Sequence, residues 1–280
     1  MFCGAGGERV GEKVRGRLVI IGGREDMDGP CTILREVARA AGGRDARILV
    51  VGAAAADPVT QTRSYCDAFA RLGAGSAEPL VVTGREDAAT AGARDAVERA
   101  TAVFFTGGDQ LRLTSVLGGT PFYRALQRRY SEGLLVAGTS AGAAVMSDTM
   151  IVAGPDDDSP KKCTTKMAPG LGLLEEVVID QHFAERGRLG RLLSAIAQNP
   201  YVLGVGIDED TAVVVSPDAR FFVIGSQTVT VLDGRDITLT NASEQAPDDP
   251  LALADVRLHV LPTGYGFDLR QRRPVPPARA

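Results

Sequence analysis

The chain has 280 residues, of which 44% are hydrophobic and 24% charged, which is ordinary globular composition with enough length to bury a sizeable core. A net charge of −4 disfavours a nucleic-acid binder, since such proteins usually carry a basic field, and the lack of tryptophan disfavours a base-stacking platform. The four cysteines form no C-x-x-C pair and predict neither a zinc site nor a disulfide framework. No apolar run resembles a signal peptide or a membrane span, so we expect a soluble cytoplasmic protein.

Short apolar runs alternate with helical patterns over the first half of the chain. Residues 1–15 are glycine-rich and charged, and we expect them to form a loose tail. The expected strands are 17–23, 46–54, 77–83, 101–110 and 134–140, and the expected helices are 31–43, 59–73, 85–100 and 120–133. This alternation predicts a mostly parallel sheet with helices on both faces, which binds ligands beyond the carboxyl ends of its strands.

The second half has a different pattern. A strand at 175–183 and a helix at 187–200 precede several short runs that read as antiparallel strands, ending with 255–269. The polar segment 153–170 is a candidate flexible loop near a site. Because no linker or repeat is present, we expect one α/β domain over residues 16–280, with an antiparallel C-terminal extension.

The segment GTSAG at 138–142 fits G-x-S-x-G, the pattern of a nucleophile elbow. A serine in a tight strand-to-helix turn tends to adopt strained backbone angles, and small neighbours remove the clashes. Ser140 would then project from the edge of the sheet, while the N–H of Ala141 at a helix N-terminus would favour an oxyanion. The glycine pair that includes Gly108 could bring a second N–H donor close. The same kind of turn can also bind an anion or simply pack tightly.

A catalytic serine needs a base, and the sequence has two histidines. His259 lies in an apolar strand, VRLHVLP, and we interpret it as structural. His182 lies in IDQHFAERG, where an apolar strand ends before a helix, so it is the candidate base. Asp208, Glu209 and Asp210 are candidates for the acid that orients it, and the residues alone do not choose among them. The order serine, histidine, acid differs from that of an α/β-hydrolase.

Three arginines, Arg186, Arg188 and Arg191, follow His182 within ten residues. The guanidinium group presents a rigid fork that matches a carboxylate. The alternatives are therefore a site for a substrate carboxylate and a solvated helix face.

Five segments together resemble the cyanophycinase family of serine exopeptidases, which is related to aspartyl dipeptidase and to the class I glutamine amidotransferase fold. They are FFTGGDQLRL, GTSAGAAVMS, DQHFAERGRLGRL, GIDEDTA and RLHVLPTGYGFDL, and the resemblance spans nearly the whole chain after its first fifteen residues. It implies a flavodoxin-like sheet, a homodimer, and a triad of Ser140, His182 and Glu209. The substrate contacts that it implies are Gln110, Asp180, Gln181, Arg186, Arg188 and Arg191.

The substrate that the resemblance implies is cyanophycin, a poly-aspartate whose β-carboxylates carry arginine, with β-Asp-Arg dipeptides as products. Arginines would pair with the free carboxylate of each unit, and Asp180 or Asp109 would pair with its guanidinium. We expect no metal or cofactor. The alternatives are a dipeptidase of the same fold acting on short Asp-X or isoaspartyl peptides, and a non-catalytic anion-binding protein. A glutamine amidotransferase is disfavoured because that chemistry normally uses cysteine at the elbow.

Overall fold

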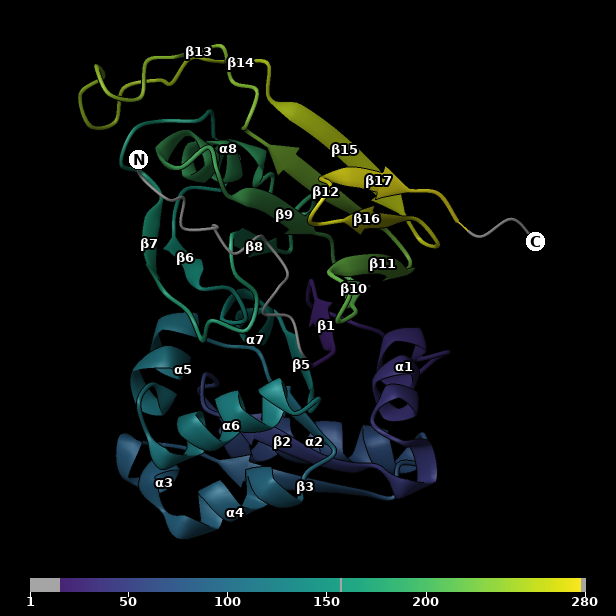
Figure 1. The fold of residues 1–280 in the computed structure, drawn as a ribbon. Helices are drawn as coiled ribbons and strands as arrows, with labels where there is room; N and C mark the ends of the chain where they lie inside the picture. The colour runs from purple at the N-terminus through teal and green to yellow at the C-terminus, as the bar shows by residue number, and fades with distance from the viewer. Residues whose placement is uncertain (1–15, 157, 278–280) are drawn as a thin grey trace, which may run out of the picture.

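The computed structural model describes residues 16–156 and 158–277, so the tail predicted over 1–15 lies outside the described residues. The strands of its larger sheet are β1 (Leu18–Ile21), β2 (Arg47–Gly52), β3 (Ser76–Val81), β4 (Ala102–Phe105), β5 (Leu135–Thr139), β10 (Thr211–Val215), β11 (Arg220–Gly225), β16 (Gly266–Asp268) and β17 (Arg273–Val275). Their order is β17-β16-β11-β10-β1-β5-β4-β2-β3 (Figure 1). Neighbouring strands in the part β1-β5-β4-β2-β3 pair in parallel. The strands β10, β11, β16 and β17 extend the sheet beyond β1 with antiparallel pairing.

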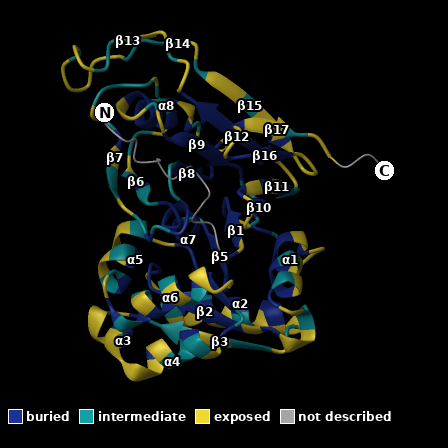
Figure 2. Cartoon of the chain, viewed as in Figure 1, coloured by how far each residue is buried: buried dark blue, intermediate teal, exposed yellow. Residues whose placement is uncertain are grey.

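Helices cover both faces of the parallel strands, as the alternation predicts. They are α1 (Thr32–Ala40), α2 (Pro58–Arg71), α3 (Arg85–Ala89), α4 (Ala91–Arg99), α5 (Gln110–Leu117) and α6 (Pro121–Ser131), with a short 3-10 helix at Gly43–Asp45. Successive side chains of a strand point to opposite faces. Leu18 and Ile20 therefore pack in the core beneath α3 to α6, while Val19 and Ile21 pack beneath α1 and α2. Figure 2 shows β1, β2 and β5 largely buried between helices whose outer faces are exposed, whereas the edge strand β3 is only partly buried.

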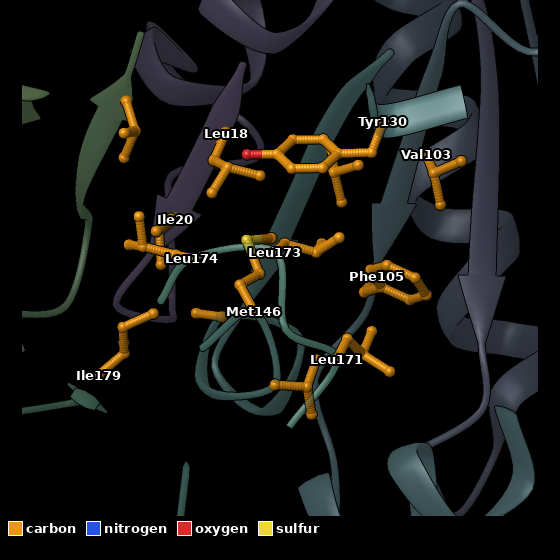
Figure 3. Packing of buried hydrophobic residues seen from close by; sticks show 14 of the residues in the cluster. Leu18, Ile20, Val103, Phe105, Tyr130, Met146, Leu171, Leu173, Leu174 and Ile179 are labelled. Carbon is orange, nitrogen blue, oxygen red and sulfur yellow. The ribbon is translucent and has the colours of Figure 1, made fainter. Parts of the chain in front are cut away.

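A second sheet lies beyond β1 and has the order β15-β12-β9-β8. Its strands are β8 (Val177–Gln181), β9 (Leu203–Ile207), β12 (Thr228–Asp233) and β15 (Arg257–Pro262), and helix α8 (Leu189–Gln198) packs against it. The remaining elements are α7 (Ala141–Ala144) and the strand pairs β6 (Thr149–Ala153) with β7 (Lys166–Pro169) and β13 (Leu239–Thr240) with β14 (Leu253–Ala254). Figure 3 shows Ile179 of the second sheet in one cluster with Leu18, Ile20 and Met146, so the two sheets share a core.

Local hydrogen bonds account for three differences from the predicted elements. The helix predicted over 85–100 is broken at Thr90, whose hydroxyl accepts the N–H of Ala93 and caps α4. Helix α5 was not predicted, and Asp109 caps it by accepting the N–H groups of its first residues. The end of the loop predicted over 153–170 forms β7, which pairs with β6.

Candidate active site

Ser140 occupies a strained turn between β5 and α7. Its φ of 54° and ψ of −111° lie outside the regions that a serine usually adopts. The turn fits only small neighbours, because a methyl group at Gly138 would lie 2.5 Å from the carbonyl oxygen of Gly142. The Ser140 N–H donates to the Ile21 carbonyl at 3.0 Å, which fixes the turn against the end of β1. The serine side chain is therefore presented at the carboxyl end of a central strand.

A continuous chain of hydrogen bonds joins Ser140, His182 and Glu209. The distance from Ser140 Oγ to His182 Nε2 is 2.9 Å, and the distance from His182 Nδ1 to Glu209 Oε1 is 2.7 Å. These residues follow β5, β8 and β9, so three separate strand ends supply them. His182 is buried, and its backbone N–H donates to the Gly22 carbonyl at 2.8 Å.

Of the three acidic neighbours, Glu209 is the one that contacts His182. Asp208 is buried, and its carboxylate accepts hydrogen bonds from the Ala184 N–H at 3.0 Å and from the Thr228 hydroxyl at 2.7 Å. Asp210 accepts the N–H of Asp26 at 2.9 Å. Because Asp208 and Asp210 contact other segments, Glu209 is the acidic residue that pairs with the imidazole of His182.

Burial lowers the pKa of His182 below its ordinary value, and the charges of Arg186 and Arg188 lower it further. The hydrogen bond with Glu209 opposes this shift. The imidazole is therefore neutral near pH 7, the form that can accept a proton from a hydroxyl. His259, by contrast, lies on β15 with its ring 5.4 Å from that of Phe267, and within the described residues its Nε2 has no hydrogen-bond partner.

The glycine pair after β4 lies beside the elbow. A Cβ at Gly107 would be 3.4 Å from that of Ser140, and Gly108 has a φ of 139° and packs against the backbone of Ala54 and Ala55. A side chain at Gly108 would clash with the Ala54 backbone, whereas a Cβ at Gly107 would only make an ordinary contact with Ser140. The structure thus brings Gly108 and Ala141, the two candidate oxyanion donors, to adjacent turns.

The remaining predicted residues have different surroundings. Arg186 is exposed, whereas Asp180, Gln181, Arg188 and Arg191 are buried and contact one another. Arg191 Nε donates to Asp180 at 2.6 Å, and Arg188 donates to the carbonyl oxygen of Gln181 at 2.6 Å. These side chains form an internal network, which excludes the solvated helix face as an interpretation of Arg188 and Arg191.

Two further contacts complete this part of the site. Asp156, which was not among the predicted site residues, accepts hydrogen bonds from Arg188 Nε at 2.8 Å and Arg191 Nη1 at 3.4 Å. Gln110 donates its amide to the Ile151 carbonyl at 2.9 Å, which ties α5 to β6.

The turn Gly22–Asp26, which follows β1, also contacts the site, although the sequence did not predict a role for it. Gly23 lies against the imidazole of His182, and Arg24 forms an ion pair with Glu209 at 3.3 Å. The available signal was a glycine pair followed by charged residues at the carboxyl end of a strand, where ligands of parallel sheets bind.

A parallel sheet that presents a strained serine to a histidine and an acid has the architecture of a serine-type hydrolase. The sequence model of peptidase family S51 matches residues 18–222. The cyanophycinase of Geminocystis herdmanii is 40% identical over 263 residues, covering 94% of this chain and 97% of that protein. The cyanophycinase of Trichormus variabilis is 40% identical over 269 residues, covering 96% of this chain and 90% of that protein.

The chain therefore belongs to peptidase family S51 and is a serine-type peptidase. A crystal structure of a peptidase from an acI-B1 Actinobacterium has the same fold, with a TM-score of 0.63 at 22% identity over 89% of this chain and 98% of that chain. Within residues 16–156 and 158–277, no helix is long and apolar enough to cross a membrane. In the same described ranges, no group of three or more His, Cys, Asp or Glu side chains could hold a metal ion.

Proposed function

We propose that this peptidase hydrolyses cyanophycin, multi-L-arginyl-poly-L-aspartate, to β-Asp-Arg dipeptides through an acyl-enzyme. The observation that carries this proposal is the chain of hydrogen bonds from Ser140 through His182 to Glu209, in a sequence 40% identical to cyanophycinases.

In the proposed mechanism, His182 Nε2 takes the proton of Ser140 Oγ as that oxygen attacks a main-chain aspartyl carbonyl of the polymer. The N–H groups of Ala141 and Gly108 stabilise the oxyanion of the tetrahedral intermediate. Its collapse breaks the C–N bond, and His182 gives its proton to the leaving amine. A water molecule then attacks the ester, again with His182 as base, and releases the dipeptide and free Ser140. Glu209 holds the imidazole in the required tautomer and stabilises the imidazolium.

The charged residues beside the triad suit a substrate that carries a carboxylate and a guanidinium in every unit. Arg186 is exposed, and its charge acts on His182, so we place it at the entrance, where it meets a substrate carboxylate. We propose that a bound substrate unit extends from Arg186 deeper into the site, toward Gln110 and the buried group of Asp180, Gln181, Arg188 and Arg191. Asp156 forms ion pairs with Arg188 and Arg191, and its side chain is 43% exposed. A substrate group that binds either arginine must therefore displace the Asp156 carboxylate.

The test is incubation of the wild type and Ser140→Ala with purified cyanophycin, followed by mass spectrometry. We expect β-Asp-Arg from the wild type and a loss of about 10⁶ in kcat for the variant, by analogy with other triads. An intact polymer with cleavage of Asp-X or isoaspartyl peptides would replace this substrate with that of a dipeptidase. Binding without cleavage of either would favour an anion-binding protein.

We further propose a single domain over residues 16–280 with a flavodoxin-like core related to class I glutamine amidotransferases, acting as a cytoplasmic homodimer. The core shared by the two sheets supports one domain. The family resemblance supports the dimer, which light scattering of the purified protein would test.

A further inference from the structure

The turn Gly22–Asp26 is tied by its backbone to two of the segments that carry the triad. The Gly22 carbonyl accepts the N–H of His182 at 2.8 Å, and the Gly23 carbonyl accepts the N–H of Asp210 at 2.8 Å. Gly23 and Arg24 have φ angles of 109° and 48°, so this part of the turn lies in the left-handed region. The turn is therefore fixed in an unusual conformation between the ends of β1, β8 and β9.

Two residues of this turn contact His182 and Glu209, and a third contacts the residue immediately before Ser140. Gly23 lies against the ring of His182, where a Cβ would be 2.6 Å from Nε2. Arg24, whose side chain is 74% exposed, pairs with the Glu209 oxygen that His182 does not use. Glu25 accepts a hydrogen bond at 2.6 Å from the hydroxyl of Thr139, the residue immediately before Ser140.

Glu25 is an unusual group to place there. It is 5% exposed, and its other oxygen accepts the Tyr65 hydroxyl at 2.8 Å. None of the ion pairs found within the described residues includes Glu25, although burying a carboxyl group is costly. Burial raises the pKa of Glu25, and the nearby charge of Asp210 also raises it. Costly buried groups of this kind are concentrated at functional sites.

We propose that the turn Gly22–Asp26 aligns the triad, and that Glu25 is a positioning residue for the nucleophile. Ser140 keeps its strained conformation only if its surroundings hold it from more than one side. The Ile21 carbonyl holds its N–H, and Glu25 holds the side chain of the preceding residue, Thr139. This inference rests on the proposed role of Ser140 as nucleophile, and it adds residues that act through the triad without contacting the substrate.

The structure offers a matched set of variants to test this inference. Thr139→Val removes the hydroxyl that donates to Glu25 on the side of the elbow, and Thr139→Ser retains it. Tyr65→Phe removes the other hydroxyl that donates to Glu25, and Tyr65 belongs to α2 and not to the elbow itself. Thr139→Val and Tyr65→Phe each leave the same carboxyl group with one donor fewer, so both are expected to unfold at lower urea concentration.

The readout is labelling of Ser140 by phenylmethylsulfonyl fluoride, followed by intact mass and peptide mapping. The Ser140 oxygen gives its proton to His182 and forms a bond to sulfur, while the sulfur–fluorine bond breaks and fluoride leaves. This small reagent therefore reports the reactivity of the nucleophile without involving the residues that bind substrate. We expect Thr139→Val to be labelled about 100-fold more slowly, since a displacement of about 1 Å can cost that factor, and Thr139→Ser and Tyr65→Phe at about the wild-type rate. On cyanophycin, the loss should be in kcat, with KM unchanged.

The possible outcomes separate the inference from the proposed function. The positioning role would be overturned if Thr139→Val were labelled at the wild-type rate, or if Tyr65→Phe lost as much labelling rate as Thr139→Val. Ser140 would remain the nucleophile in either case. Failure to label Ser140 in the wild type, together with full activity of Ser140→Ala, would overturn the proposed nucleophile and the inference with it. Labelling of Ser140 without action on cyanophycin would change the substrate only, and the comparison of variants would still decide the positioning role.

Discussion

Gly23 lies against the imidazole of His182, and the position of the ring depends on the absence of a side chain there. A Cβ at Gly23 would overlap Cε1 and lie 2.6 Å from Nε2, the atom that faces Ser140. The glycine is also required by its φ of 109°.

We therefore predict that Gly23→Ala lowers kcat by about 100-fold or more, because the ring must move away from Ser140. Gly73→Ala is the matched control, since Gly73 has a φ of 82° and open space where the Cβ would lie. It should lose about 1 kcal/mol of stability and keep its activity. Steady-state kinetics and urea unfolding of both variants provide the comparison, and equal kcat values would contradict the role of Gly23.

Glu209→Gln should lower kcat by about 10⁴, the loss known for the equivalent change in a serine–histidine–aspartate triad. The amide preserves the shape of the side chain but cannot stabilise the imidazolium that forms beside it. Circular dichroism should show an unchanged fold. A variant that retains a tenth of the wild-type kcat would rule out Glu209 as the acid of the triad.

The pH dependence of kcat/KM should reflect the lowered pKa of His182. The base acts in its neutral form, so activity should fall as pH decreases through that pKa, with a midpoint below 6.5. Arg186→Gln removes a charge that lowers this pKa, and the midpoint should move to higher pH. Arg124→Gln, on α6, is the control and should leave it unchanged. A midpoint that stays fixed in Arg186→Gln would show that its charge does not act on the base.

Asp180→Asn should destabilise the protein by about 3–5 kcal/mol, because it leaves Arg191 and Arg188 with too little negative charge in a buried position. Asp156→Asn removes a partner of the same arginines, but Asp156 is 43% exposed and water can replace it, so we expect about 1 kcal/mol or less. Urea unfolding measures both. Similar values for the two variants would mean that the buried pair is not specially important to stability.

Much of the architecture was accessible from local sequence patterns. Apolar runs alternating with amphipathic segments predict the parallel sheet and its two helical layers, because burial on both faces requires continuous apolar strands. The elbow around Ser140 could also be predicted from the sequence, because its glycines allow backbone segments only a few residues apart to pack closely. Thr90 shows the limit of this reasoning, because a single capping hydroxyl divides a segment with continuous helical periodicity.

The sequence by itself determined a serine at the carboxyl end of a central strand and a histidine after another strand. Only the tertiary structure decided which residues surround them. Asp208, Glu209 and Asp210 are consecutive acidic residues, and their position in the sequence does not distinguish them as partners of His182. The path of the turn between β9 and β10 gives each of them a different hydrogen-bond partner. The contacts of Gly23, Arg24 and Glu25 with the triad likewise depend on how the ends of β1, β5, β8 and β9 meet. Side-chain direction at a strand end is set by twist and by the neighbouring strand, and residues far apart in the chain determine both.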